Sequence, residues 1–251
     1  MRFAKPFVTF KQRIITMKKL TLLFSFFLLF GCAAQGQIFK QAKDILGGGA
    51  AFSKEEAANA LKEALEQGTS KGVDLLSKVD GYYKNPEIKI PFPQEAQTVE
   101  SKLRALGLGN QVDQAVESLN RAAEDAAYEA KDIFIAAIKS LTINDAINIV
   151  KGDKDAATQF LERETTTSLE GKFNPIIEAS LQKVNATKYW SDVMGTYNKV
   201  PFVKKVETDL TAYVTAKAID GLFVMIAKEE LNIRENAGAR TSELLKKVFG
   251  K

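Results

Sequence analysis

Residues 203–251 read VKKVETDLTAYVTAKAIDGLFVMIAKEELNIRENAGARTSELLKKVFGK, and this stretch decides the fold. Its apolar residues recur every three or four positions, the spacing that places side chains on one face of a helix. The apolar face is broadest between Ile219 and Ala227. A helix this apolar belongs in the interior of a fold. We therefore expect a long C-terminal hub helix, preceded by Pro201, with the other helices packed around it.

The residues before this stretch carry the start and stop signals of further helices. Ser53 and Glu56 have the spacing of a capping box, which opens a helix. By the same kinds of signal we expect helices over Gln94–Leu106, Asn110–Ser140, Thr142–Val150, Asp153 to about Leu169 with Gly171 at its end, Asn174-Pro175 to about Val184, Tyr189–Tyr197, and Ser242–Phe249 capped by Thr241.

One short segment near Ile88–Pro93 is expected to be extended instead, because its prolines oppose helix and its apolar residues alternate. The predicted fold is therefore all-α. We expect an elongated multi-helix bundle around the C-terminal hub helix, with this one extended segment lying across the helices or forming one small ribbon.

The composition excludes several kinds of chemistry. The chain has no histidine and one cysteine, which rules out histidine-based catalysis and thiolate metal clusters. No Walker, dinucleotide-binding or zinc motif is present. We therefore expect no cofactor and no metal site, and we identify no catalytic residue.

The net charge argues against a nucleic-acid partner. The formal charge of the chain is +4, but residues 1–31 hold six basic residues and no acidic one, so the remainder carries a net charge of −2. Proteins that bind nucleic acid present a basic surface to the phosphates. A mildly acidic domain lacks that feature, and we expect no nucleic-acid partner.

The N-terminus has the pattern of an export signal. Met17-Lys18-Lys19 precedes a short apolar run, Leu20–Phe30. A membrane-spanning helix needs roughly 20 apolar residues, whereas a short run after a basic region is typical of a secretory signal peptide. The following residues, Leu29-Phe30-Gly31-Cys32, resemble the bacterial lipoprotein signal, in which the cysteine is lipidated and becomes the first residue after cleavage.

This resemblance implies the domain order. We expect a signal peptide over residues 1–31, within which residues 1–16 are an upstream extension, a flexible tether over residues 32–52, and a helical domain over residues 53–251. Lipid on Cys32 would attach the protein to a membrane of the cell envelope. Because no aspartate follows Cys32, we expect the outer membrane, with the domain facing the periplasm.

Several stretches together resemble the bacterial domain-of-unknown-function family 4197. They are Asn85–Pro93, Gly152–Thr158, Ile219–Phe223 and, most specifically, Ile233–Gly250. The resemblance covers roughly Ser53–Lys251. It implies a secreted or lipid-anchored helical protein of uncharacterised activity, and it transfers no catalytic residue to this chain.

The densest polar cluster lies where the hub helix ends. A candidate site for a ligand or partner consists of Glu230, Arg234, Asn236, Arg240 and Thr241. Glu230 and Arg234 are four residues apart and can pair on one helix face, and Arg240 can bind a carboxylate or phosphate through two N–H groups. In the alternative interpretation, Arg240 bonds the carbonyls that end the hub helix and fixes the last helix in place.

A second candidate is an aromatic platform for sugars formed by Tyr82, Tyr83, Tyr189 and Trp190, for which core or rim packing is the alternative.

Our leading hypothesis is a non-enzymatic, lipid-anchored envelope protein that binds an envelope protein or a small ligand. The first alternative is a carboxylate-dependent hydrolase, which needs only two acidic residues, or a carrier of an apolar ligand, which needs an internal cavity of several hundred Å³. The second is a purely structural envelope protein, favoured if Glu230 and Arg240 are paired within the fold.

Overall fold

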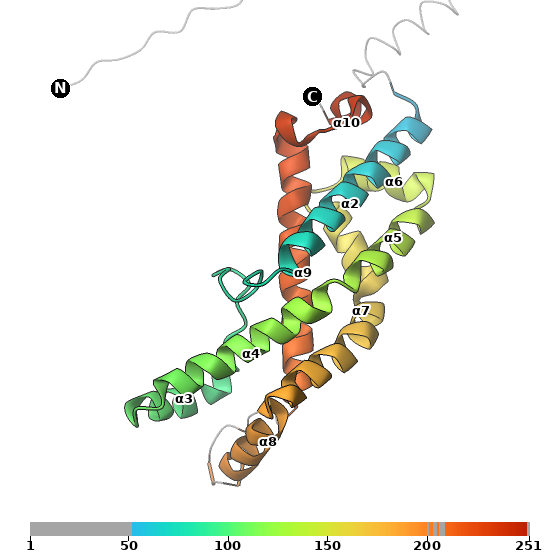
Figure 1. Cartoon of the computed structure of the whole chain (residues 1–251). Helices are drawn as coiled ribbons and strands as arrows, with labels where there is room; N and C mark the ends of the chain where they lie inside the picture. Colours follow the sequence, from blue (N-terminus) through green and yellow to red (C-terminus); the bar gives the residue numbers. More distant parts are fainter. Residues whose placement is uncertain (1–51, 200, 203–204, 206–208, 250–251) are drawn as a thin grey trace, which may run out of the picture. The chain divides into compact units, whose positions relative to one another are not determined.

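The computed structural model describes residues 52–199, 201–202, 205 and 209–249, which belong to one compact unit, residues 50–251. Within these ranges the chain forms helices and no strand, so the predicted all-α class is confirmed (Figure 1). The α-helices are α2 (Lys54–Leu76), α3 (Gln97–Ala105), α4 (Gly109–Ala127), α5 (Ala130–Ser140), α6 (Ile143–Lys151), α7 (Ala156–Lys183), α8 (Ala186–Tyr197), α9 (Leu210–Glu235) and α10 (Glu243–Phe249), with short 3-10 helices η1 (Gln94–Ala96) and η2 (Ala237–Ala239).

The hub helix is α9, drawn in red-orange in Figure 1, and it contacts α2, α4, α7 and α8. Val214, Ala218 and Leu222 along it are fully buried. The helix begins at Leu210, because the carboxylate of Asp209 accepts a hydrogen bond from the N–H of Ala212 at 2.9 Å and so caps its first turn. Pro201 precedes the helix as expected, and the central position of the helix is confirmed.

The apolar character of α9 is used largely inside the fold. By length and composition alone, α9 could cross a membrane, and so could α5 and α6 if that sharply bent pair formed one span; both statements apply to the described residues. More than half of the apolar window of α9 is buried against the other helices. This burial is what a core helix requires.

The segment between α2 and α3 crosses α9 at Gly221. The hydroxyl of Tyr82, which is fully buried, donates a hydrogen bond to the carbonyl of Ala218 at 2.7 Å. A Cβ atom on Gly221 would lie 2.8 Å from the Tyr82 ring and 3.2 Å from Ile88. The absence of a side chain at Gly221 therefore permits the close crossing.

The extended segment predicted near Ile88–Pro93 forms neither a strand nor an α-helix and lies against α4. The side chain of Asn120 accepts a hydrogen bond from the N–H of Ile90 at 2.8 Å and donates one to its carbonyl at 2.9 Å. One buried amide thus satisfies both backbone groups of Ile90, which is itself buried. This pairing lets an irregular segment lie on the core at little energetic cost.

The prediction of one helix over Asn110–Ser140 is wrong, because the chain forms α4 and α5 with a break at Tyr128 and Glu129. No glycine or proline marks the break. The N–H of Glu129 bonds the carbonyl of Ala126 at 3.1 Å, and the N–H of Lys131 bonds that of Tyr128 at 3.3 Å. These three-residue hydrogen bonds are those of a 3-10 turn, which is common at helix ends. After the turn, α5 contacts α2 and α7.

The opposite error concerns α7, where two helices were predicted around a stop at Gly171 and a start at Asn174-Pro175. A single helix runs from Ala156 to Lys183 with Pro175 inside it. Gly171 and Pro175 are both exposed, so the Gly171 carbonyl that loses its donor at Pro175 can bond water instead. Buried Leu169, Phe173 and Ile177 hold the two halves on one core-facing side.

The last helix, α10, closes a small second core against α2. Its cap is Ser242, whose hydroxyl accepts the N–H of Leu245 at 3.1 Å. The predicted cap, Thr241, instead donates to the side chain of Gln67 on α2 at 2.8 Å. Buried apolar side chains from three helices fill this core: Ala60, Ala64, Ile233, Leu245 and Val248.

Two glycine substitutions are expected to change stability in opposite directions. Gly171→Ala should raise the free energy of unfolding by about 0.5–1 kcal/mol, because alanine is the better residue inside a continuous helix and nothing lies within 4 Å of the added methyl group. Gly221→Ala should lower it by about 1–3 kcal/mol through overpacking. Urea denaturation measures both. A Gly171→Ala variant less stable than the wild type would contradict a continuous α7.

The contact between α2 and α10 is expected to weaken in acid. A hydrogen bond from Lys247, then one from the backbone N–H of Ser53, lowers the pKa of Glu56 below its ordinary value of 4.5. The unfolded chain therefore binds a proton more readily than the folded one, and stability falls as the pH drops from about 4.5 through the lower folded pKa. Thermal unfolding across this window should show a shallower pH dependence in Glu56→Gln. An identical dependence in both proteins would contradict this role of Glu56.

Candidate functional site

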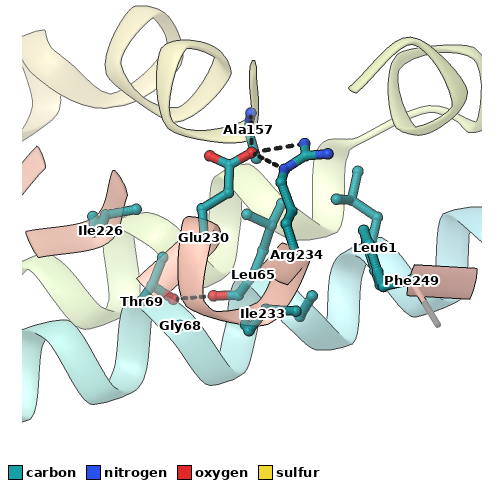
Figure 2. Close-up of a pocket in the computed structure, with 11 residues that line it drawn as sticks. Leu61, Leu65, Gly68, Thr69, Ala157, Ile226, Glu230, Ile233, Arg234 and Phe249 are labelled. Carbon is teal, nitrogen blue, oxygen red and sulfur yellow. Dashed lines mark hydrogen bonds and ion pairs between the residues drawn. The ribbon is translucent and has the colours of Figure 1, made fainter. Parts of the chain in front are cut away.

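The structure brings three of the five candidate residues, Glu230, Arg234 and Arg240, into direct contact at the end of α9. The Glu230 carboxylate accepts hydrogen bonds from Nε and Nη2 of Arg234 at 2.9 and 2.8 Å (Figure 2). Glu230 is 8 % exposed, which is rare for a carboxylate and demands full compensation of its charge. Arg234 also donates to the carbonyl of Ile149 at 3.0 Å, in the last turn of α6.

The same Glu230 carboxylate also caps the start of α7. It accepts the backbone N–H groups of Ala157 and Thr158 at 3.0 and 2.8 Å, and the hydroxyl of Thr158 at 2.8 Å. The first N–H groups of a helix have no partner within it, and the helix dipole favours a negative charge there. Asp155, the residue at the cap position of α7, makes no side-chain capping bond. The predicted cap at Asp153 is wrong, because Glu230 from α9 accepts the N–H groups that begin α7.

Arg240 is positioned as the alternative interpretation describes. It is 8 % exposed, and it donates from Nε to the carbonyl of Ile233 at 3.0 Å and from Nη2 to that of Arg234 at 2.8 Å. These are two of the carbonyls that a helix end leaves without partners. The guanidinium thus caps α9 and fixes the start of the connection to α10.

The two remaining candidates also serve local structure. The side chain of Asn236 accepts the N–H of Gly238 at 2.9 Å and shapes the turn after α9. The hydroxyl of Thr241 bonds Gln67, as described above. Both residues are exposed, and the structure does not gather them around the Glu230 carboxylate.

A small cavity lies beside Glu230, between α2 and α9. Its volume is about 20 Å³, room for one water molecule. Figure 2 shows apolar side chains around it, and no second carboxylate of the described residues lines it. The arrangement therefore offers no pair of acids flanking a substrate. The space is also far below the several hundred Å³ that an enclosed apolar ligand requires.

A second buried carboxylate, Glu124 on α4, was not among the residues predicted from the sequence. It is 4 % exposed and accepts the backbone N–H groups of Tyr82 and Tyr83 at 3.0 and 3.1 Å, while Arg121 donates to it at 2.7 Å. Arg121 also bridges to Asp80 and Glu117, both at 2.8 Å. The three- and four-residue spacings of Glu117, Arg121 and Glu124 signal helix-face pairing. They say nothing of the distant loop that Glu124 binds.

The electrostatic consequences of this network are local. Hydrogen bonds from Lys84 and then from Arg121 lower the pKa of Asp80. Bonding to Glu124 is the largest cause that raises the pKa of Arg121, and burial raises the pKa of Tyr82. Asp80 and Arg121 therefore keep their charge and Tyr82 stays neutral at neutral pH.

The structure separates the four residues of the proposed aromatic platform. Tyr82 is buried against α9, and Trp190 is buried in α8 with its ring 5.6 Å from that of Phe92. Tyr83 lies beneath the charged groups of Lys89 and Arg121, whereas Tyr189 is exposed. Two of the four rings are therefore closed to a sugar.

Among the described residues, no group of three acidic, cysteine or histidine side chains is placed to hold a metal ion.

The model of a family described as "Protein of unknown function (DUF4197)" matches residues 51–250, almost the whole helical unit. No curated protein and no solved structure matches the chain.

Loss of the Glu230 carboxylate is expected to destabilise the fold strongly. Glu230→Ala leaves Arg234 and two amides of α7 without their partner, and breaking a buried pair in this way costs about 3–5 kcal/mol. Glu235→Ala, one turn on, removes an exposed partner of Lys154 and should change stability by less than about 0.5 kcal/mol. Urea denaturation of both variants measures the difference. Equal effects would contradict the capping role of Glu230.

Proposed function

The chain belongs to the DUF4197 family of proteins of unknown function, and on that premise we propose that it is a lipid-anchored, non-enzymatic binding protein of the cell envelope. The anchor in this proposal is a lipid on Cys32, and the binding element is the helical unit. The membrane meant is the outer membrane, with the unit facing the periplasm.

The anchor is supported by the N-terminal sequence, which lies outside the described residues. The chain has a single cysteine, and it stands at the one position that the lipoprotein signal requires, directly after Leu29-Phe30-Gly31. Each buried methylene of an acyl chain contributes about 0.8 kcal/mol to membrane binding, and two or more chains hold a protein stably. A net charge of −2 on the remainder of the chain is too small to oppose that binding.

One observation favours binding over catalysis: the charged groups of the candidate site are consumed by the fold. Glu230 and Arg234 satisfy each other and the ends of α7 and α6, and Arg240 is bonded to two carbonyls of α9. A catalytic acid, base or anion-binding arginine has to reach a substrate. These three side chains instead bond to groups within the protein. A function would therefore have to come from other residues at the surface, through binding.

The same pairing favours a second candidate, a purely structural envelope protein. Exposed apolar side chains distinguish the two functions. Val79, Leu106, Tyr128 and Tyr189 are each more than 60 % exposed. Tyrosine is enriched where proteins bind one another, because it combines a large apolar ring with a hydroxyl. We therefore place a binding function first.

Substitution of Cys32 tests the anchor. In cells grown with an alkyne-labelled fatty acid, the wild-type protein should carry the label and remain with the membranes after carbonate washing. Cys32→Ala should lose the label and leave the membrane fraction. Full labelling of the Cys32→Ala protein would rule out this lipid attachment.

Photo-crosslinking in cells tests the binding function. A benzophenone amino acid at Tyr128 or Tyr189 should give a discrete cross-linked product, because aromatic surface positions mark interfaces. The same group at Glu170, an exposed position on α7, serves as the control and should give none. If all three positions remain free of discrete products, the structural function replaces the binding function.

A further inference from the structure

An open groove runs between α5 and α7. It is open to solvent and has a volume of about 460 Å³. Its floor is made by Ile133, Ala136 and Ala137 of α5, spaced so that they share one helix face. The small alanine side chains leave the space that a larger residue would fill.

The polar atoms along the groove are mainly acceptors. Asp132 on α5 and Glu164 on α7 supply a carboxylate from each helix, and no lysine or arginine lines the groove. The hydroxyls of Ser140 and Thr165 already donate their protons to the carbonyls of Ala137 and Leu161, at 2.7 and 2.6 Å. Of the three hydroxyls in the lining, that of Ser140 can therefore only accept further hydrogen bonds, that of Thr165 is buried, and that of Ser168 can donate or accept.

The two carboxylates differ in their availability. Glu164 accepts a hydrogen bond from its neighbour Arg163 at 2.9 Å, and that arginine is 65 % exposed. Asp132 is exposed and lines the groove from α5. An approaching cation would therefore be held first by Asp132, with Glu164 as the weaker second group.

We propose that this groove binds an organic cation: a primary ammonium group on a short aliphatic body. The aliphatic part covers Ile133, Ala136 and Ala137, and the ammonium group donates its three hydrogen bonds to Asp132 and the neighbouring acceptor oxygens. The cation can be a free alkylamine or the side chain of a lysine on a partner. The chemistry recognised is the same in both cases.

This inference names a ligand class for the binding function proposed above, but it stands on separate residues. Loss of Cys32 lipidation would leave the groove intact, and an empty groove would leave the anchor intact. The two failures are therefore distinguishable.

Titration of the mature protein with hexylammonium, followed by two-dimensional amide NMR, tests the proposal. Shifts should concentrate in residues 132–140 and 164–168, and hexanol and hexanoate, matched in length, should bind more weakly. Asp132→Asn should weaken hexylammonium binding at least about tenfold, the effect of losing a charge-assisted hydrogen bond. Glu243→Gln, a highly exposed carboxylate on α10, should leave it unchanged.

A second variant tests the space in the groove while leaving its carboxylates unchanged. Ala136→Phe fills the groove at an exposed position, so the protein should fold and lose hexylammonium binding. Tighter binding of a lysine-bearing helical peptide than of hexylammonium would identify a partner side chain as the source, and the reverse would identify a free amine. Equal binding of hexanol and hexylammonium, or no shifts in α5 and α7, would overturn the proposal.

Discussion

The fold depends on one carboxylate placed where three helices meet. The Glu230 side chain, on the hub helix, forms an ion pair with Arg234 and accepts hydrogen bonds from the first N–H groups of α7. Arg234 in turn donates a hydrogen bond to a carbonyl in the last turn of α6. A buried charge is tolerated only when its attraction and hydrogen bonds offset the loss of water. Glu230 accepts five such hydrogen bonds, three from α7 and two from Arg234. Because these bonds are directional, they fix where along α9 the start of α7 lies.

The same solution appears a second time in the molecule. Glu124 takes two successive backbone N–H groups and one arginine, as Glu230 does, and it ties the loop after α2 to α4. Apolar packing alone would allow helices to slide along one another, because it has little direction. Two carboxylates with fixed partners remove that freedom. Of the buried side-chain polar atoms in the described residues, the hydroxyl of Thr215 alone has no hydrogen-bond partner.

Local signals in the sequence predicted much of this fold, and distant contacts explain the rest. The capping boxes at Ser53 and Thr142 start α2 and α6 as expected, since every residue involved lies within one turn. The apolar pattern of residues 203–251, broadest between Ile219 and Ala227, placed the hub helix in the interior. Pro175, by contrast, looked like a helix start, and the contacts of buried Phe173 and Ile177 with the core override that local preference.

The candidate site divides along the same line. Pairing of Glu230 with Arg234 follows from a four-residue spacing, and the capping by Arg240 was one of two stated alternatives. The capping of Ala157 and Thr158 by Glu230 joins residues more than 70 positions apart, and no local pattern in the sequence indicates it.

Amide hydrogen exchange at Ala157 and Thr158 tests the central claim most directly. First-turn amides of a helix are normally open to exchange, and Asn144 in α6, which is exposed, provides the comparison within the same molecule. If Glu230 caps α7, the two α7 amides exchange far more slowly than that of Asn144, at a rate close to that of the core. Exchange as fast as at Asn144 would contradict the account.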